Sequence, residues 1–260
     1  MSDLSTSSPL VRVDQLLVEQ GQARSRTRAQ RLIKHGRVRL VEEGVHRQID
    51  KPSEKLPADS HFDIEDDPEE RYVSRAGLKL EGLLLSQKVR FDHQTLLDIG
   101  QSTGGFSDCA LTFGAARVVG VEVGHGQLDQ RLADNDRVVC LEGINARELP
   151  DTQLMQWAPQ GFDGALMDVS FISQTLILPE LARLLPAGAT LFSLVKPQFE
   201  LSRDDIDQRG LVRDQAAHRK VEDKIRQALK DNGFELVTWQ PSVITGGDGN
   251  QEWMMMAVKR

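Results

Sequence analysis

The pattern of apolar and polar residues divides the chain into a short first part and a longer second part. In the second part, apolar runs of strand length alternate with amphipathic segments of helix length. The runs predicted as strands are residues 95–98, 117–121, 138–141, 164–167, 190–195, 236–239 and 253–258. Because strands and helices alternate, we expect an α/β domain with a doubly wound, mostly parallel seven-stranded sheet covered by helices on both faces.

Four segments of the second part have the periodicity of helices. The clearest is 214–231, where Val221, Ile225 and Leu229 recur at period four and Gly233 follows the last turn. The other predicted helices are residues 78–85, a segment that opens at Phe106, and residues 175–185.

The first part predicts a small α+β module. A short helix is expected over residues 13–18, broken at Gly21, and a second over residues 25–35, with Ser25 as its N-cap and Gly36 at its end. Short strands are expected at residues 38–41, 48–50 and 61–64.

An acidic, proline-containing segment separates the two parts. Residues 65–70 read Glu-Asp-Asp-Pro-Glu-Glu, which is typical of a linker. The length of the chain allows roughly two domains. We therefore predict domains at residues 1–66 and 67–260.

Charge distinguishes the first part from the rest. The chain has a formal net charge of −7, yet residues 11–40 hold eight basic and only two acidic side chains. Clustered arginines suit phosphate, because one guanidinium can donate two parallel hydrogen bonds to its oxygens. The residues expected to contact RNA are Arg12, Arg24, Arg26, Arg28, Arg31, Lys34 and Arg37. The alternative is a solvated helix face without a nucleic-acid partner.

A glycine-bearing turn follows the first strand of the second part. It begins at Asp98 and contains Gly100, Gly104 and Gly105 before the helix that opens at Phe106. Glycines let the backbone approach a ligand closely, and a helix start offers free N–H groups. The spacing differs from the Gly-x-Gly-x-x-Gly of dinucleotide sites, which disfavours a nicotinamide-dependent oxidoreductase. The alternative is a turn whose glycines serve packing only.

Polar residues stand at the carboxyl ends of the predicted strands, where ligands bind in such sheets. They are Asp98, Glu122, Asn145, Asp168 and Lys196. Glu122 follows the glycine turn by about 20 residues, where doubly wound folds hold ribose hydroxyls. Lys196 follows a buried strand, where desolvation favours its neutral, proton-accepting form, and Asp168 could hold it in place. A structural ion pair between Lys196 and Asp168 is the alternative.

Two sets of motifs carry a resemblance to a known family. The basic stretch of residues 11–40 resembles an S4 domain, a small module that contacts folded RNA mostly through shape and phosphates. The second part contains, in order, Tyr72-Val-Ser-Arg-Ala-Gly-Leu-Lys79, Asp98-Ile-Gly-Gln-Ser-Thr-Gly-Gly-Phe-Ser107, Asp168-Val-Ser-Phe-Ile-Ser173, Leu194-Val-Lys-Pro-Gln-Phe-Glu200 and Gly249-Asn-Gln-Glu252. With the S4-like start, the chain resembles the TlyA (haemolysin A-like) family of rRNA 2′-O-methyltransferases, whose catalytic domain is of the FtsJ type.

The resemblance implies a Rossmann-like methyltransferase fold and methyl transfer from S-adenosylmethionine to a ribose 2′-hydroxyl of ribosomal RNA. The positions that match the family's catalytic tetrad are Lys79, Asp168, Lys196 and Glu252, with Lys196 as the general base. The implied cofactor-binding residues are Asp98, Gly100, Gly104, Gly105, Phe106, Glu122, Asn145 and Asp168. The chain departs from the family at Ala76, Gln101 and Glu122, where a second glycine, a smaller residue and aspartate are common, and none of these removes a tetrad member.

Composition limits the alternatives. The longest uncharged runs have 12 residues, short of the about 20 of a membrane-spanning helix, which argues against a membrane-active haemolysin. An RNA-binding protein with an inactive methyltransferase domain is a further hypothesis, opposed by the complete tetrad. The first residues lack a signal-peptide pattern and Cys109 and Cys140 lack metal-ligand spacing, so we expect a cytoplasmic protein with no bound metal. The expected partner is ribosomal RNA or a ribosomal subunit rather than a membrane, and no oligomeric state is predicted.

Overall fold

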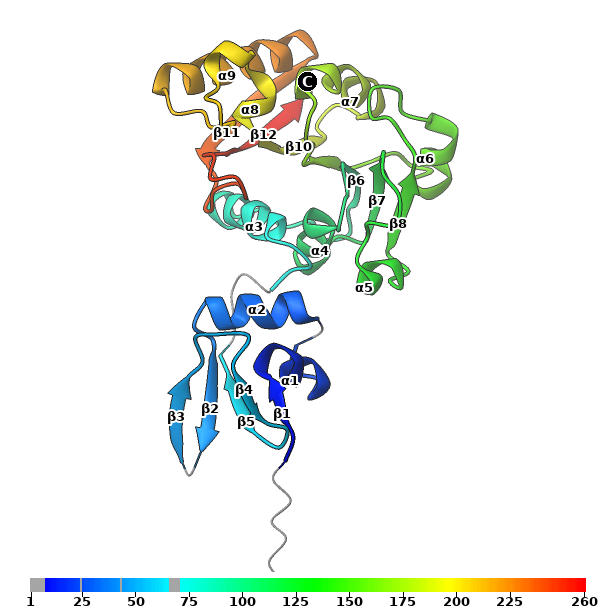
Figure 1. The fold of residues 1–260 in the computed structure, drawn as a ribbon. Coiled ribbons are helices and arrows are strands. Elements are labelled where there is room, and N and C mark those ends of the chain that lie inside the picture. Colours follow the sequence, from blue (N-terminus) through cyan, green and yellow to red (C-terminus); the bar gives the residue numbers. More distant parts are fainter. Residues whose placement is uncertain (1–7, 24, 43, 66–70) are drawn as a thin grey trace, which may run out of the picture. The chain divides into compact units, whose positions relative to one another are not determined.

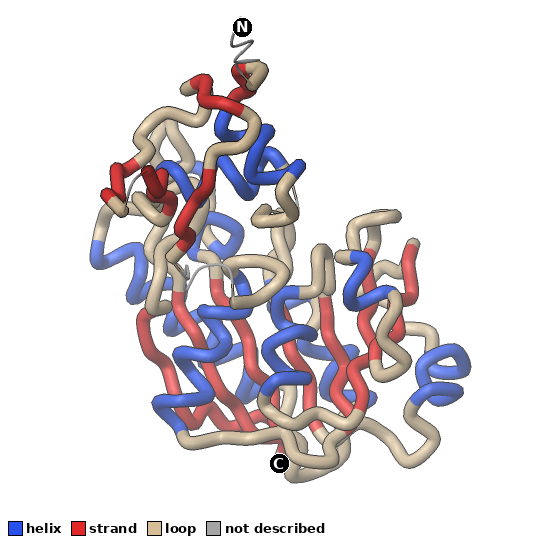
Figure 2. The backbone as a smooth tube through the Cα atoms, turned by 90° about the horizontal axis from the view of Figure 1, so that it is seen from below, coloured by secondary structure: helices blue, strands red, loops and turns tan. Residues whose placement is uncertain are grey.

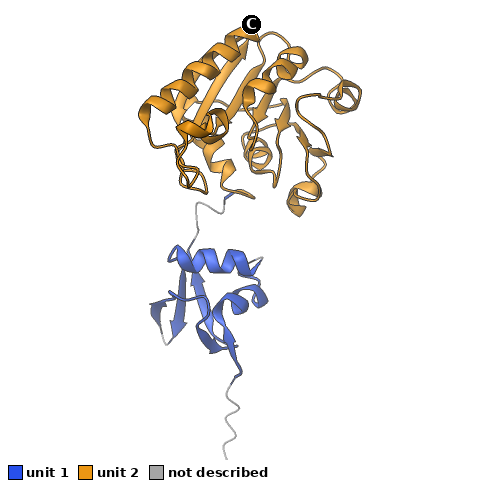
Figure 3. Cartoon of the chain, turned by 45° about the horizontal axis from the view of Figure 1, so that its top comes forward, with its two compact units in different colours: residues 1–71 blue, residues 72–260 orange. Residues whose placement is uncertain are grey.

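The structure is a computed structural model of the chain, and it describes residues 8–23, 25–42, 44–65 and 71–260. The chain divides into two compact units, Met1–Arg71 and Tyr72–Arg260 (Figure 3). The predicted boundary at residue 66 and most of the predicted linker lie outside the described residues, as does Arg24.

The first unit combines two helices with two small sheets (Figure 1). Its elements are β1 (Leu10–Arg12), α1 (Val13–Glu19), α2 (Arg26–Lys34), β2 (Val38–Glu42), β3 (Val45–Gln48), β4 (Lys55–Pro57) and β5 (His61–Ile64). Strand β2 pairs antiparallel with β3 and β5, and β1 pairs antiparallel with β4. Leu16 of α1, Leu32 of α2 and Val38 of β2 belong to one buried core, so both helices pack on the sheet side chains.

Both predicted helices of this unit are confirmed. Ser25 is the N-cap of α2, and its Oγ accepts a hydrogen bond from the backbone N–H of Arg28 at 3.2 Å. The strand predicted at residues 48–50 is wrong: the strand is β3, which ends at Gln48, and Ile49 turns into the core instead. The sequence also gave no signal for β1 and β4, because each has only three residues and most of their side chains are partly or fully exposed.

The second unit alternates strands with helices. Its strands are β6 (Thr95–Ile99), β7 (Arg117–Glu122), β8 (Val138–Glu142), β9 (Gly164–Met167), β10 (Thr190–Val195), β11 (Phe234–Pro241) and β12 (Trp253–Lys259). Its helices are α3 (Ala76–Gln87), α4 (Gly105–Thr112), α5 (Gln130–Ala133), α6 (Asp151–Trp157), α7 (Leu178–Leu184), α8 (Pro197–Glu200) and α9 (Gln215–Asp231), with short 3₁₀ turns η2 (Gln174–Leu176) and η3 (Arg203–Asp205).

One mixed sheet organises the second unit. The strand order is β11-β12-β10-β9-β6-β7-β8; β12 pairs antiparallel with β11 and β10, and the other neighbouring strands pair parallel. Figure 2 shows these strands side by side. The chain moves outward from β6 to β8 and then returns to β9 on the other side of β6. The sheet therefore has a topological switch point between β6 and β9, where doubly wound folds bind ligands.

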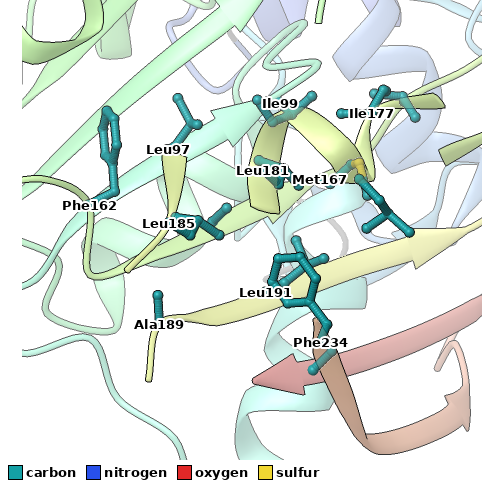
Figure 4. Packing of buried hydrophobic residues seen from close by; sticks show 14 of the residues in the cluster. Leu97, Ile99, Phe162, Met167, Ile177, Leu181, Leu185, Ala189, Leu191 and Phe234 are labelled. Carbon is teal, nitrogen blue, oxygen red and sulfur yellow. The ribbon is translucent and has the colours of Figure 1, made fainter. Parts of the chain in front are cut away.

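Successive residues of one strand point to opposite faces of the sheet and enter different cores. On β6, Leu97 and Ile99 belong to one buried cluster and Leu96 to another. The first cluster includes side chains of α6, α7 and α9, and Figure 4 shows part of it. The second includes side chains of α3 and α4. Helices thus cover both faces, which confirms the predicted doubly wound, mostly parallel seven-stranded sheet.

The helix predicted over residues 175–185 is two elements, η2 and α7. Pro179 lies in the first turn of α7, with Ile177 as the N-cap. Proline has no N–H to donate, and its ring would clash with the carbonyl four residues earlier, so one continuous helix cannot pass through it. This break matters for the site, because the segment before η2 forms a wall of a pocket.

Candidate active site

The ends of β6 and β9 meet at the switch point of the sheet. The backbone N–H of Asp168, directly after β9, donates to the carbonyl oxygen of Ile99 at 3.0 Å. Gly100 has φ +77°, and a Cβ at this position would lie 2.8 Å from the carbonyl oxygen of Asp168. Only glycine fits such a conformation beside another backbone without strain. The glycine turn therefore packs directly against the strand end that carries Asp168.

A pocket of about 800 Å³ opens at this edge of the sheet. Four of the predicted cofactor-binding residues line it: Gly100, Glu122, Asn145 and Asp168. A smaller hollow of about 60 Å³ shares Gly100 and Asp168 with the pocket and is also lined by Gly105 and Phe106. The larger volume is in the range of small-molecule binding sites.

Glu122 and Asn145 occupy the ends of the next two strands. The Oε2 of Glu122 accepts from the backbone N–H of Ser102 at 2.9 Å, and its Oε1 accepts from that of Gly124 at 2.8 Å. The Oδ1 of Asn145 accepts from the backbone N–H of Arg147 at 3.1 Å. A carboxylate offers about four lone-pair sites, so Glu122 is held in place and still has acceptor capacity for a ligand.

Asp98 and Gly104 of the glycine turn line neither of these two pockets. The carboxyl group of Asp98 is fully buried, and its Oδ2 accepts from Ser107 Oγ at 2.6 Å. Ser107 Oγ in turn accepts from Gln101 Nε2 at 2.8 Å. Burial, helped by the charge of Asp168, raises the pKa of Asp98 to about 7. Gly104, with φ +93°, packs so closely on Leu132 that a Cβ would lie 2.3 Å from its Cδ1.

Lys196 and Asp168 form an ion pair at the rim of the pocket. The distance from Lys196 Nζ to Asp168 Oδ1 is 2.6 Å, and Nζ also donates to Ser170 Oγ at 2.9 Å. The side chains of Lys196 and Asp168 are only 13% and 16% exposed. The sequence predicted the contact with Asp168 and missed Ser170, although Ser170 belongs to the same quoted motif.

A second ion pair joins residues that are 173 positions apart. Lys79 of α3 donates to Glu252 Oε2, and both side chains are buried. Burial raises the pKa of Glu252, and the positive charges of Lys79 and Lys196 oppose this shift. A buried carboxylate with a cation beside it stays ionised more easily than one without.

The two ion pairs lie next to each other at the carboxyl end of β10. Val195 pairs with Trp253 in the antiparallel ladder, so the neighbouring residues Lys196 and Glu252 stand side by side on adjacent chain segments. The charges of Lys196 and Asp168 both act on the pKa of Glu252. The structure thus brings together the predicted set Lys79, Asp168, Lys196 and Glu252 beside the pocket that Asp168 lines. Their catalytic role stays a prediction.

Two of the predicted RNA-contacting residues of the first unit, Arg12 and Arg26, contact the buried acid Asp14. Arg12 donates to both carboxylate oxygens of Asp14 at 3.0 Å, and Arg26 donates to Oδ2 at 3.1 Å. Gln30 donates to the same Oδ2 at 2.7 Å. The Arg12 guanidinium, with help from these other donors, holds the pKa of Asp14 well below its usual range. The side chains of Arg12 and Arg26 are nevertheless 38% and 56% exposed, so both remain reachable by a phosphate.

The other predicted RNA-contacting residues lie on or after α2. Arg28 and Arg31 are half-buried on α2, and Lys34 at its last turn is exposed. The Nη1 of Arg37 lies 3.4 Å from the Oε2 of Glu65, with which it forms an ion pair. No described contact tests these RNA assignments, which stay predictions. Asp14, one of the two acids within residues 11–40, binds Arg12 and Arg26 of the basic cluster and holds them together.

Among the residues that the structure describes, no three His, Cys, Asp or Glu side chains are grouped so that they could hold a metal ion. In the same described ranges, none of the helices has both the length and the apolar character needed to cross a bilayer. Cys109 and Cys140, both among the described residues, take part in no disulfide.

Comparisons with known proteins agree with this architecture. A family model described as "FtsJ-like methyltransferase" matches residues 72–259, and an S4 domain model matches residues 11–40. "Putative rRNA methyltransferase YqxC" of Bacillus subtilis is 41% identical over 94% of this chain and 84% of its own length. "16S/23S rRNA (cytidine-2'-O)-methyltransferase TlyA" of Mycobacterium tuberculosis is 34% identical, over 94% and 88%. A solved structure titled "Putative hemolysin from Streptococcus thermophilus" has a TM-score of 0.73 and 38% identity, and the match covers 96% of this chain and 89% of that one.

The fold and the site together define a Rossmann-like methyltransferase domain preceded by an S4 domain. Both the ordered motifs and the sequence identity extend over nearly the whole chain. The chain belongs to the TlyA (haemolysin A-like) family, in which an S4 domain is joined to an FtsJ-like methyltransferase domain.

Proposed function

We propose that the protein methylates a ribose 2′-hydroxyl of ribosomal RNA with S-adenosylmethionine as methyl donor. The observation that carries this proposal is the meeting of Lys79, Asp168, Lys196 and Glu252 beside a pocket at the switch point of the sheet. The family supports methyl transfer as the reaction class. The related TlyA enzyme is named for cytidine 2′-O-methylation of 16S and 23S rRNA, so a cytidine is the expected target.

The pocket fits a nucleoside cofactor. Glu122 stands at the end of the strand next to the glycine turn and has acceptor sites left for the two hydroxyls of a ribose. Asn145 lines the same pocket one strand further along, beside the expected position of an adenine. Gly100 has no side chain, so the backbone of the turn can approach the cofactor closely. Asp168 lines the pocket away from Asn145, where its carboxylate could accept from the ammonium of the cofactor's methionine part. When bound, S-adenosylmethionine would supply an electrophilic methyl group, and its sulfur would leave as a neutral thioether when the methyl–sulfur bond breaks.

Lys196 is the proposed proton acceptor. Its Nζ lies at the pocket rim between Asp168 and Ser170, which fix its position from one side. In the neutral form this amine accepts the proton of a ribose hydroxyl as the hydroxyl oxygen attacks, so the oxygen never carries a full negative charge. General-base help of this kind contributes about 10²- to 10⁴-fold to a rate.

Lys79 and Glu252 are proposed to tune the charge around Lys196. Glu252 stands beside Lys196 and already has Lys79 as a counter-ion, so its negative charge is largely compensated. This arrangement holds Lys196 in place without giving it a second full counter-charge. Removing Lys79 would leave Glu252 free to pair with Lys196 and to keep it protonated.

The first unit is proposed to hold the ribosomal RNA. Arg12 and Arg26, which one buried carboxylate places together, offer guanidinium groups to phosphates. Phosphate contacts position a nucleic acid without reading its bases. With ribosomal RNA as substrate, the location we propose for the enzyme is the cytoplasm.

The test is methyl transfer with and without Lys196. Small and large ribosomal subunits from cells lacking the gene are incubated with enzyme and labelled S-adenosylmethionine, and the modified ribose is mapped. We expect Lys196→Ala to lower kcat at least about 10²-fold while calorimetry gives a cofactor Kd within about threefold of the wild type. Lys220→Ala, which removes an exposed lysine of α9, is the matched control and should keep full activity. Turnover by Lys196→Ala at the wild-type rate, or binding of NAD in place of S-adenosylmethionine, would sink the proposal.

A further inference from the structure

A buried carboxylate outside the predicted tetrad joins three segments around Lys196. Glu200 ends α8, the single helical turn that follows Lys196, and its side chain is 1% exposed. Its Oε1 accepts from the backbone N–H of Gln174 at 2.8 Å, and its Oε2 accepts from Ser173 Oγ at 2.5 Å. Lys224 of α9 donates to the same Oε2 at 3.0 Å. Because a buried charge is costly unless it is paired, these bonds fasten α8, η2 and α9 to one another.

Gln174 extends this cluster to the strand that carries Lys196. Its Nε2 donates to the carbonyl oxygen of Leu194 at 2.5 Å, and its Oε1 accepts from Ser193 Oγ at 2.8 Å. Both partners belong to β10, immediately before Lys196. The backbone before Lys196 is therefore bound through the Gln174 side chain, and the turn after it through Glu200.

The loop of residues 168–173 is held in place by contacts at both of its ends. At its start, Asp168 and Ser170 contact Lys196 Nζ, and at its end Ser173 is bound to Glu200. Between them, Phe171 has φ +63°, a left-handed conformation that a non-glycine residue keeps only where its surroundings require it. The Phe171 ring also packs on a residue of α8, Phe199, with ring centroids 4.9 Å apart.

We propose that Glu200 is a positioning residue for methyl transfer. It does not touch the reacting atoms; it fixes the end of the 168–173 loop so that Asp168 and Ser170 hold Lys196 Nζ at the pocket rim. Without the carboxylate, Ser173 Oγ and the Gln174 N–H lose this acceptor and Lys224 loses its counter-ion. Lys224 still donates to Ser173 Oγ and to the Glu200 carbonyl oxygen, so the loop is held less firmly in its strained conformation. This inference rests on the proposed function, because positioning has meaning only for an enzyme that transfers a methyl group.

The experiment compares Glu200→Ala and Glu200→Gln with the wild type. Glu222→Ala, which removes an acid of α9 that pairs with Arg226 on the surface of that helix, is the matched control. For each variant, kcat and the KM for ribosomal subunits are measured well below its melting temperature. Hydrogen exchange of peptides that cover residues 168–176 is recorded in the same preparations.

We expect Glu200→Ala to lower kcat about 10- to 100-fold with KM changed less than about threefold, since small misplacements of catalytic groups act on kcat. Exchange over 168–176 should accelerate in the same variant. Glu200→Gln should recover part of both effects, because its carbonyl oxygen can still accept the Gln174 N–H, and Glu222→Ala should change neither.

Two outcomes overturn the inference while leaving the proposed function intact. One is a wild-type kcat in folded Glu200→Ala, and the other is a lower kcat with unchanged exchange over 168–176. If the wild-type enzyme itself transfers no methyl group, the proposed function fails and the positioning role fails with it, whatever the exchange data show.

Discussion

The buried carboxyl group of Asp98 should make the stability of the protein depend on pH. Asp98 is fully buried, its Oδ1 has no hydrogen-bond partner among the described residues, and burial raises its pKa to about 7. In the unfolded chain the same group titrates near its ordinary value of 3.8. The substitution that tests this is Asp98→Asn, which keeps the shape and an acceptor for Ser107 Oγ but cannot ionise.

The direction of this pH effect on stability follows from which state, folded or unfolded, keeps the proton of Asp98 to the higher pH. Below pH 3.8 both states carry a neutral Asp98, so the group costs the folded state nothing. As the pH rises, Asp98 ionises first in the unfolded chain, which stabilises the unfolded state relative to the folded one. This loss of folding stability reaches its full size once the pH has passed the folded pKa of about 7. A shift of about three pKa units corresponds to about 4 kcal/mol, of which roughly 3 kcal/mol should develop between about pH 5 and pH 8.

The assay is urea unfolding of the wild type and of Asp98→Asn at about pH 5 and about pH 8. The two proteins share every other titrating group, so the difference between their unfolding free energies isolates Asp98. We expect this difference to move in favour of Asp98→Asn by about 2–4 kcal/mol from the lower to the higher pH. A difference that stays constant between the two pH values would show that Asp98 does not titrate in this range, and the reasoning from burial would be refuted.

Two other predictions concern packing and charge. Gly120→Ala would place a Cβ 2.0 Å from the Cδ of Gln101, so it should lower the free energy of unfolding in urea by about 1–3 kcal/mol. Most of this loss of stability should disappear when Gln101 is also replaced by alanine. An equal loss with Gln101 and with Gln101→Ala would contradict the contact. Asp14→Asn replaces the acceptor of Arg12 and Arg26 and should cost about 1–3 kcal/mol at neutral pH with weaker RNA binding. Because the folded pKa of Asp14 is lowered, this stability gap should narrow as the pH falls below the ordinary value of 3.8, and a gap that stays the same at low pH would rule out the ion pairs as its cause.

The central strands of the second unit's sheet were predictable because they are buried and continuous. The predicted bounds of β9 and β10 are those of the structure, since each is an apolar run that ends at a charged residue, Asp168 or Lys196. The errors fall where burial is partial. Strand β3 has four residues with no buried side chain, so its sequence carries no alternation to detect. Helix α6 buries only Leu154, which is too weak a pattern to predict a helix.

The site was predictable in composition but not in all its contacts. The strand-end rule placed Asp168 and Lys196 together, because adjacent parallel strands end at the same edge. It could not supply Lys79 and Glu252, which come from a helix and an antiparallel strand and entered the prediction through the family motifs. Glu200 was within a quoted motif, yet its partners lie 26 and 24 residues away on other elements, and nothing in the sequence pairs them.

Asp168 shows why cofactor binding and proton transfer occupy one edge of the sheet. The backbone N–H of Asp168 donates to the carbonyl oxygen of Ile99, and its own carbonyl oxygen packs against Gly100. Asp168 also lines both pockets, and its carboxylate pairs with Lys196. A shift of the β9 end would therefore move the pocket wall and the proton acceptor together. In the proposed reaction, the carboxylate that would face the methyl donor also holds the amine that would take the ribose proton, so one residue at the end of β9 positions both groups.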